Sequence, residues 1–349
     1  MKNRSLSTLL LIGIICLISV LAALPPVPAL AQKKPIELKW ASHMPDTNRI
    51  QKYGVVGLGT QIEEATKGRV KIIHYSGESL AKGKDVPDSV AGGIADIGYV
   101  VTVYNPGRFP MSEMFMQYLG LPSGELSSRI LWELYEKFPK AFSKDYGDVK
   151  VLGLSVSEPS HIGSRKPVRT AEDVKGLKIR ATGNAAKVFK SLGAIPISLP
   201  VVEMYPALET GVVDAYSISE HVTGDYRLYE LVNYFTQLNV YTLIFATVMN
   251  LDRWNALPPD IQTQIMSVCG VKASMHIGKV NDWTGKESME KLATMPKKEI
   301  IFPTKETVAT FRRAAEPILN DYVAKLEASG LPAKAVLSEL GRLVEKYGK

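Results

Sequence analysis

Cysteine is nearly absent from the chain, with two residues in 349. Cys16 lies in an N-terminal apolar segment and directly follows Ile15, whereas a lipoprotein signal requires a small residue before its cysteine. Cys269 is then alone in the rest of the chain, so no disulfide can form within it. We expect Cys269 to be a small buried residue in a helix and not a nucleophile.

Long hydrophobic runs are absent beyond the N-terminus. Two basic residues precede a single apolar stretch at residues 9–24, and a proline-rich segment that ends in Ala-Leu-Ala at residues 29–31 follows it. This order is typical of a secretory signal peptide, and the stretch is shorter than the ~20 residues that span a bilayer. We therefore predict a cleaved signal peptide over residues 1–31 and a mature periplasmic protein that is not itself inserted in the membrane.

An excess of one charge is also absent. The chain has 42 Lys and Arg against 35 Asp and Glu, a net charge of +7, and no basic run. This balance argues against nucleic acid as a partner. Hydrophobic residues make up 46% of the chain, which is enough for two domains with a core in each and excludes a disordered or fibrous protein.

Common catalytic and cofactor motifs are missing as well. The sequence contains no G-x-G-x-x-G, Walker loop, H-E-x-x-H, G-x-S-x-G or C-x-x-C motif. The five histidines show no metal-ligand spacing, so we predict neither a metal nor a cofactor. Ser160 and His161 are adjacent, and on a strand they would point to opposite faces and could not form a catalytic pair. An enzyme is therefore not expected.

Strand and helix patterns alternate along the sequence. Residues 36–40 alternate with period two, apolar residues between 50 and 65 form one helical stripe, and residues 70–73 resemble a strand. This β-α-β order predicts a parallel sheet with crossover helices and hence the α/β class. Further expected elements are a helix at about 125–146, strands at 149–154 and 177–180, a helix at 184–192, and a mostly helical region from 258 onward.

Two segments look like copies of one unit. Residues 86–97 and 204–215 both consist of a short helical pattern, a Gly-x-x-Asp sequence and an apolar strand pattern. One such segment alone would be an ordinary helix-to-strand turn, since glycine is the usual left-handed cap. Two copies, each among strand and helix signals, predict two similar lobes with a ligand site between them.

Arg180 is the strongest candidate for a binding residue. It ends an apolar strand pattern, and Thr182-Gly183-Asn184 leads directly into a helix. The carboxyl end of a strand beside free helical amides is where open α/β sheets bind ligands and anions, and a guanidinium fits a carboxylate with two parallel hydrogen bonds. An ordinary surface arginine is the alternative, and Asn184 is expected to cap the helix first and to contact a ligand second.

Four stretches resemble a known family, at residues 176–180, 191–194, 203–214 and 250–258. In this order and spacing they are similar to the extracytoplasmic solute receptors of tripartite ATP-independent periplasmic (TRAP) transporters, over about residues 36–327. The resemblance implies an α/β, two-lobed periplasmic binding protein fold with a ligand cleft between the lobes. It also implies a receptor that closes on a small organic acid and delivers it to integral membrane subunits driven by an ion gradient.

The domain organisation expected from this resemblance is discontinuous. Residues 32–153 with about 245–280 would form lobe I, residues 154–244 with about 281–330 would form lobe II, and residues 331–349 would form a C-terminal helix. The connections between lobes should lie near residues 152–156 and 243–249, and the protein should be a monomer. The same lobes could instead serve an ATP-driven importer, a sensor kinase or a secreted enzyme built on this scaffold.

The resemblance also implies binding residues. Arg180 matches the family's arginine that holds the ligand carboxylate. His43 matches family contacts from the loop after the first strand, and Tyr99 and its neighbours match contacts on the strand that follows the first Gly-x-x-Asp. The family's asparagine after the second Gly-x-x-Asp does not carry over, because the sequence here has Tyr216-Ser217-Ile218. A second cation that some sugar-acid receptors have is missing from residues 157–162.

These departures bear on the ligand. One guanidinium suits one carboxylate, and Ile218 in place of an amide makes the pocket less polar. If tyrosines line it, a monocarboxylate with an aromatic or aliphatic tail is favoured, although the tyrosines could equally be core residues. The complete set of candidate substrate-binding residues is Arg180, Asn184, His43, Tyr99, Tyr216, Ser217 and Tyr241, with Tyr104 as a further tyrosine of the same group.

Overall fold

The computed structural model describes residues 34–117, 120–239 and 241–348. The elements below belong to the compact unit Ile36–Lys349. The predicted signal peptide, with its cleavage site before Gln32, lies outside the described residues. Within the described ranges, no helix combines the length and the apolar character that crossing a membrane requires.

The first sheet has five strands in the order β2-β1-β3-β10-β4. β1 (Ile36–Ser42) lies parallel to both β2 (Val70–Tyr75) and β3 (Ile97–Val101), as the β-α-β pattern predicts. β10 (Ile244–Asn250) runs antiparallel between β3 and β4 (Val149–Val156). A late strand therefore completes a sheet that the N-terminal part of the protein begins.

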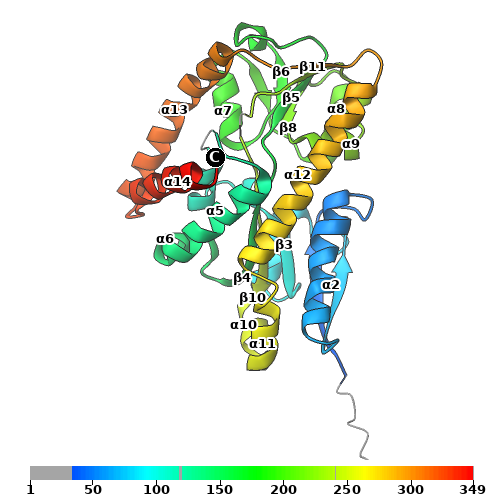
Figure 1. Cartoon of the computed structure of the whole chain (residues 1–349), viewed down its shortest axis with the longest axis vertical. Helices are drawn as coiled ribbons and strands as arrows, with labels where there is room; N and C mark the ends of the chain where they lie inside the picture. Colours follow the sequence, from blue (N-terminus) through cyan, green and yellow to red (C-terminus); the bar gives the residue numbers. More distant parts are fainter. Residues whose placement is uncertain (1–33, 118–119, 240, 349) are drawn as a thin grey trace, which may run out of the picture. The chain divides into compact units, whose positions relative to one another are not determined.

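The second sheet has six strands in the order β11-β9-β5-β8-β6-β7. β6 lies parallel to β7 and β8, and β5 runs antiparallel to β8 and β9. In Figure 1 the labelled strands of the second sheet lie above those of the first sheet, and α12 passes both. The strand bounds are β5 His161–Ser164, β6 Lys178–Arg180, β7 Ile195–Ile197, β8 Ala215–Ile218, β9 Tyr234–Thr236 and β11 Glu299–Ile301.

Helices surround both sheets (Figure 1). The long helix α12 packs against α5 and β4 at one end and against α9 toward the other. α13 contacts α7 and α4, and α14 contacts α5 and α4. The helical bounds are η1 Ile50–Val55, α2 Val56–Ala65, η2 Gly83–Asp85, α3 Val86–Ala91, η3 Thr102–Tyr104, α4 Pro110–Met116, α5 Gly124–Lys137, α6 Pro139–Tyr146, η4 Glu172–Val174, α7 Gly183–Ser191, η5 Val201–Glu203, α8 Met204–Glu209, α9 Glu220–Asp225, η6 Leu228–Glu230, α10 Leu251–Asn255, α11 Pro259–Met266, α12 Val271–Thr294, α13 Lys305–Ala328 and α14 Ala333–Tyr347.

The two Gly-x-x-Asp segments fold alike, as predicted. Each joins a short helix to a strand, α3 to β3 and α8 to β8, and Gly93 and Gly211 have φ of 73° and 75°, which favours glycine. The aspartate amide of each copy donates to the neighbouring parallel strand, Asp96 at 3.0 Å and Asp214 at 2.8 Å. The copies therefore build equivalent corners in the two sheets.

Three expectations about single elements are wrong. The helix expected at 125–146 is two helices, because Pro139 lacks an amide hydrogen and keeps Phe138 out of the helical conformation, at φ −122° and ψ 55°. The stripe at 50–65 begins with the π-helical turn η1, whose wider turn rotates Tyr53 outward to 42% exposure. Cys269 lies in the bend after α11 and not in a helix, although it is buried and burial raises its pKa to about 12.

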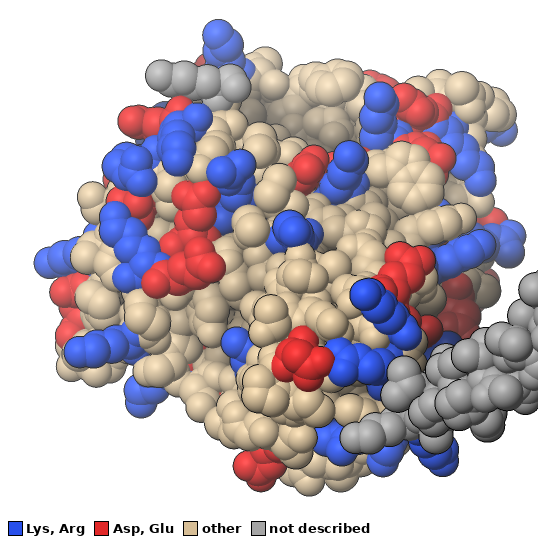
Figure 2. Space-filling model, turned by 60° about the horizontal axis from the view of Figure 1, so that its bottom comes forward, with Lys and Arg blue, Asp and Glu red and all other residues tan. Residues whose placement is uncertain are grey.

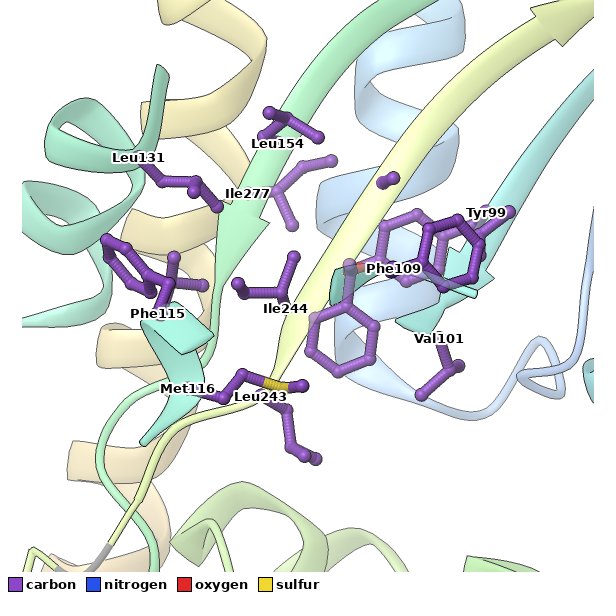
Figure 3. Packing of buried hydrophobic residues seen from close by; sticks show 14 of the residues in the cluster. Tyr99, Val101, Phe109, Phe115, Met116, Leu131, Leu154, Leu243, Ile244 and Ile277 are labelled. Carbon is purple, nitrogen blue, oxygen red and sulfur yellow. The ribbon is translucent and has the colours of Figure 1, made fainter. Parts of the chain in front are cut away.

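The largest hydrophobic core packs the first sheet against its helices and continues to Ile179 of β6 in the second sheet and to Phe189 of α7. Figure 3 shows Leu131 of α5, Ile277 of α12 and Ile244 of β10 converging in it, and all three are fully buried or nearly so. A second cluster around Met204, Leu208 and Phe235 supports the second sheet. The first cluster therefore reaches both sheets, and the second belongs to the second sheet alone.

Two segments that connect the sheets lie side by side. The amide of Ser157 donates to the Leu243 carbonyl at 2.9 Å, and the amide of Ser160 donates to the Tyr241 carbonyl at 2.7 Å. The Ser157 hydroxyl in turn accepts from the Leu243 amide at 2.9 Å. The segment that follows β4 and the segment that precedes β10 are therefore hydrogen-bonded to each other.

Charged side chains of both signs are interspersed on the face shown in Figure 2, without a broad area of one sign. The protein has exposed pairs of opposite charge, such as Arg69 with Asp260 and Lys325 with Asp321. Exposed pairs of this kind contribute little to stability. This face accordingly offers no basic region of the kind that binds nucleic acid.

Candidate functional site

One cavity is lined by residues of both sheets. It contains about 500 Å³ of empty space, part of it open to solvent. Its walls come from the segments after β1 and β3, from β6, β8 and β10, and from α9. The lining residues are His43, Met44, Asn48, Val101, Val103, Tyr104, Arg180, Thr182, Val201, Ile218, Ser219, His221, Val222, Tyr226, Leu243 and Phe245.

Arg180 provides a buried cation in this wall. It ends β6, and its side chain and backbone together are only 2% exposed. Nε and Nη2 both donate to the Leu199 carbonyl, at 3.1 and 3.0 Å, which fixes the plane of the guanidinium. Nη1 is buried and has no hydrogen-bond partner, and no carboxylate within the described ranges pairs with Arg180. A buried cation without an anion is costly, so the arrangement fits an external carboxylate.

Further polar atoms of the cavity wall lack partners. They are Oγ1 of Thr182, Oγ of Ser219 and Nδ1 of His43. Burial lowers the pKa of His43 to about 4, against a smaller opposing effect of Glu78, so the ring is neutral near pH 7. Because buried polar atoms are normally hydrogen-bonded, this concentration of unpaired atoms is typical of a ligand site.

The rest of the wall is mainly apolar. Val101, Val201, Ile218, Leu243 and Phe245 are all buried against the cavity. Burial also raises the pKa of the Tyr104 phenol, which stays neutral. Among the described lining residues Arg180 is the only Lys or Arg, and no Asp or Glu is present. The cavity therefore suits a ligand with one anionic group and an apolar remainder.

A buried ion pair adjoins the cavity. Glu158, in the connection from β4 to β5, accepts through Oε1 from both Nδ1 and the backbone amide of His221, at 2.8 and 3.1 Å. Burial alone would lower the pKa of His221, but the charge and hydrogen bond of Glu158 outweigh it and raise the pKa above 6.5. His221 therefore favours the charged form more than a free histidine does.

The candidate residues do not all reach this cavity. Arg180 and His43 line it, and so does Tyr104. Tyr99 lies behind the wall, stacked between His43 and Phe245 with ring centroids at 6.4 and 5.2 Å. It is fully buried in the core, which is the alternative foreseen for the tyrosines.

Tyr216, Ser217 and Tyr241 are held by protein contacts. The Tyr216 hydroxyl lies 2.9 Å from the Thr223 hydroxyl, and the Tyr241 hydroxyl donates to the Ser217 carbonyl at 2.7 Å. Neither Tyr216 nor Ser217 lines the cavity, and Tyr241 lines an adjacent pocket instead. The Ser217 hydroxyl itself is buried and has no hydrogen-bond partner among the described residues, and it is the Ser217 backbone carbonyl that Tyr241 contacts.

Asn184 also faces the adjacent pocket, together with Lys187 and Gln117. The expectation that it caps the helix is wrong, because α7 begins at Gly183 and Thr182 occupies the cap position without a hydrogen bond from its hydroxyl group to the helix. Gly183 has φ of 56°, so the glycine makes the turn and Asn184 falls inside the first helical turn.

Ser219 and His221 are cavity residues that the sequence reasoning missed. Both directly follow β8, at the carboxyl end of a strand parallel to β6. The rule that selected Arg180 applies to them equally. The residues that follow the strand of the second Gly-x-x-Asp copy could therefore have been predicted as binding residues by the same rule.

Together the two sheets, the cavity between their strand ends and the buried arginine define a two-lobed binding protein of the α/β class. The family model for DctP, bacterial extracellular solute-binding protein, family 7, matches residues 41–326. The protein belongs to this family, and the resemblance to TRAP solute receptors is confirmed.

Solved structures agree with this assignment. A TRAP periplasmic solute binding protein from Desulfovibrio salexigens is 32% identical, with a TM-score of 0.82 over 90% of this chain and 97% of its own. In that open structure the C-terminus of a symmetry mate occupies the ligand binding site. A TRAP solute binding protein from Rhodoferax ferrireducens is 25% identical with a TM-score of 0.84, covers 90% of this chain and 98% of its own, and holds copurified benzoate.

A curated relative from a Nostoc species is 27% identical over 68% of this chain and 66% of its own length. It is named a monocarboxylate 2-oxoacid-binding periplasmic protein. Members of the family are transport binding proteins of the extracytoplasmic space that bind small organic acids.

Proposed function

We propose that this protein is the solute receptor of a TRAP transporter and binds a small monocarboxylate with an aromatic or aliphatic tail. The proposal rests on Arg180, which is buried in a largely apolar wall. Among the described residues, no carboxylate pairs with its guanidinium, and Nη1 has no hydrogen-bond partner. Two nitrogens of the guanidinium are already bound to Leu199, so the group is preorganised before a ligand arrives.

The composition of the wall favours one carboxylate over two. A second carboxylate would be buried beside Ile218, Leu243 or Phe245 without a lysine or arginine to neutralise it. Burying an unpaired charge costs several kcal/mol, on the order of its desolvation penalty. Dicarboxylates and sugar acids with many hydroxyl groups are therefore disfavoured.

Two similar proteins support a carboxylate ligand. The Rhodoferax protein holds benzoate, a monocarboxylate on an aromatic ring, and the Desulfovibrio protein holds the C-terminus of a symmetry mate in its ligand binding site. In both, the bound group is a carboxylate or ends in one. The unpaired Arg180 of the present protein is suited to the same chemistry.

The remaining parts of the role follow from this binding function. The protein acts without turnover, is exported by its N-terminal signal segment to the periplasm, works as a monomer and passes the acid to integral membrane subunits. Residues 32–153 with about 245–280 would form lobe I and residues 154–244 with about 281–330 would form lobe II, each built around one of the sheets.

Mass spectrometry of the small molecules that copurify with the protein tests the proposal. We expect a monocarboxylate in stoichiometric amount. Calorimetric titration of the stripped protein should then show binding of phenylacetate and benzoate, and much weaker binding of succinate and glucuronate. A preference for succinate or glucuronate would contradict the proposed ligand class, and conversion of a bound acid to a product would contradict the receptor role.

A further inference from the structure

We propose that His221 is a second ligand-binding residue, which donates a hydrogen bond from Nε2, in its protonated form, to an oxygen of the acid held by Arg180. This inference rests on the proposed function and narrows it. The ligand then carries an acceptor oxygen, such as a hydroxyl or keto group, near its carboxylate.

The position of the His221 ring is fixed by Glu158. One carboxylate oxygen, Oε1, accepts from the ring Nδ1 at 2.8 Å and from the backbone amide at 3.1 Å. Both side chains are nearly inaccessible, at 6% and 10% exposure. The ring is therefore held at one edge by a buried partner.

The other ring edge is available to a ligand. His221 is one of the residues that line the cavity with Arg180, and within the part of the protein that the structure describes Nε2 has no hydrogen-bond partner. Histidine offers Nδ1 and Nε2 on opposite edges of the ring. With Nδ1 bound to Glu158, Nε2 is the atom left for the cavity.

Protonation reverses the role of this atom. When the ring is neutral, the proton on Nδ1 faces Glu158 and Nε2 carries only a lone pair, which repels a keto oxygen and can only accept a hydrogen bond from a hydroxyl group, a neutral bond that is weaker than a charge-assisted one. When the ring is charged, Nε2 gains a proton and donates to such an oxygen. Binding of an oxygen-bearing acid should therefore weaken as pH rises through the His221 pKa.

The charged groups around His221 favour the proton. Glu158 faces it from the β4–β5 connection, and Asp225 faces it from the end of α9. Arg49, which follows β1, opposes them, but its guanidinium is bound to Asp225 at 2.7 Å and to Glu287 of α12 at 2.9 Å.

The remaining acidic groups on the packed elements are engaged elsewhere or protonated. Asp282 of α12 accepts from the amides of Gly124 and Glu125 at the start of α5. Glu230 of η6 is paired with Arg227. Burial and the charge of Glu158 raise the pKa of the neighbouring Glu220 to about 7, so Glu220 also titrates between the two ends of the pH range tested below and must be controlled for.

The other histidines near the site behave differently. Burial lowers the pKa of both His43 and His161 to about 4, so neither carries a charge at neutral pH. His221 is thus the histidine whose surroundings support a donor proton at the pH where the protein works.

Calorimetric titration from about pH 5.5 to about pH 9 tests the inference. The probes are mandelate and phenylacetate, which differ only in the hydroxyl group beside the carboxylate. For the wild type we expect mandelate to bind more tightly at low pH and to lose about tenfold or more in affinity as pH rises, whereas phenylacetate should change less.

Two variants separate binding from structure. His221→Asn keeps a donor near the Nδ1 position for Glu158 and removes Nε2, so it should lose the mandelate preference and the pH dependence. His221→Gln places an amide near the Nε2 position and should bind mandelate with a flat pH profile. Glu220→Gln, the matched control, should keep the wild-type profile.

The outcomes distinguish this inference from the proposed function. If His221→Asn binds mandelate with unchanged affinity and unchanged pH profile while acids still bind, the inference is wrong and the monocarboxylate receptor stands. If the pH dependence disappears in Glu220→Gln instead, the responsible group is Glu220 and the inference is wrong. If the wild type binds neither acid at any pH, the inference is wrong and acids with an aromatic tail are excluded from the proposed ligand class.

Discussion

Arg180 and Glu220 show, at the scale of single residues, how this protein keeps charge in its interior. Arg180 is 2% exposed, and among the described residues its guanidinium is hydrogen-bonded only to the Leu199 carbonyl. Glu220 is 3% exposed and has one oxygen bound to Gln237, while Oε2 has no partner. Such groups reduce stability and persist where binding or positioning requires them.

Replacement of Glu220 by glutamine should stabilise the protein at alkaline pH. The pKa of Glu220 is raised from 4.5 to about 7, so the unfolded protein releases this proton more readily than the folded protein does. Below about pH 4.5 the side chain is neutral in both states, and the folded protein has its full stability. As pH rises through about 7 the folded protein must bury a charged Glu220, and this stability is lost.

Denaturant unfolding of Glu220→Gln and wild type at both ends of this range measures the effect. We expect no difference near pH 4.5 and a gain for the variant at pH 8 of about 3 kcal/mol at most, the figure that corresponds to the whole pKa difference. Equal stability at pH 8 would show that the pKa of Glu220 is not raised in the folded protein.

At this scale the sequence could predict Arg180 but not its surroundings. A basic residue at the end of a strand before a helix is visible in the sequence, and so is the apolar Ile218. Glu158 and His221 are in contact although they are 63 residues apart in the sequence, and no local sequence pattern predicts this contact. Tyr99 and Tyr216 could not be separated from Tyr104 because burial in the core and exposure to a cavity select the same residue type.

At the scale of elements, α12 is held very close to α5. A Cβ atom on Gly278 would lie 2.5 Å from both the Gly124 carbonyl and the Ser128 hydroxyl. That hydroxyl donates to Gly124 at 2.6 Å and accepts from the Val156 amide at 2.8 Å, so it cannot move freely. The absence of side chains at Gly278 and Gly124 therefore sets the distance between the helices.

Gly278→Ala should lower the free energy of unfolding by about 1–3 kcal/mol, the usual cost of overpacking. The matched control is Gly54→Ala, also in a helical segment, where a Cβ would lie 3.5 Å from the nearest atom of the Ile50 side chain. It should change stability by less than about 0.5 kcal/mol. Thermal unfolding of both variants measures this, and equal melting temperatures would contradict the close packing of α12.

Elements were predictable where a local rule was decisive. Alternation revealed β1, and glycine with positive φ marked the ends of α3 and α8. Pro139 also indicates that α5 ends and α6 begins there. The prediction of one continuous helix followed the apolar stripe on both sides of Pro139 and was therefore wrong. The π-helical start of the stripe at 50–65 has no comparable signal, because its side chains are ordinary helix residues and the extra residue per turn is accommodated by packing.

At the scale of the whole molecule, ion pairs connect the parts that carry the two sheets. Arg49, in the segment after β1, donates to Asp225 at 2.7 Å, and the neighbouring Asn48 donates to the same carboxylate at 3.1 Å. Asp225 ends α9, which follows β8 of the second sheet. Binding proteins with two lobes generally close as rigid bodies, and we therefore expect contacts of this kind to favour a closed arrangement here.

Asp225→Ala should shift the ligand-free protein toward a more open arrangement. We expect a larger radius of gyration by small-angle scattering without ligand and the wild-type radius at saturating phenylacetate. Asp321→Ala, which removes an exposed pair within α13, is the control and should leave both radii unchanged. An Asp225 variant with the wild-type radius in the free state would show that this contact does not influence closure.

The fold class could be predicted from the strand-helix order and the two Gly-x-x-Asp copies, and the family from the resemblance of four stretches to its members, at residues 176–180, 191–194, 203–214 and 250–258. The second sheet's order and the return of β10 between β3 and β4 could not, since they depend on pairing between distant segments. The predicted lobe boundaries and hinge positions stay predictions that scattering and variants of the connecting segments can address.

The central claim is that Arg180 binds the ligand carboxylate, and calorimetric titration of Arg180→Ala with the acid that copurifies tests it most directly. The account predicts a loss of about 2–5 kcal/mol in binding free energy with an unchanged circular dichroism spectrum, because the buried carboxylate loses its charged partner. Arg180→Lys should be nearly as weak, since a point charge cannot replace the fixed planar fork. Wild-type affinity in Arg180→Ala would contradict the account and place the ligand elsewhere.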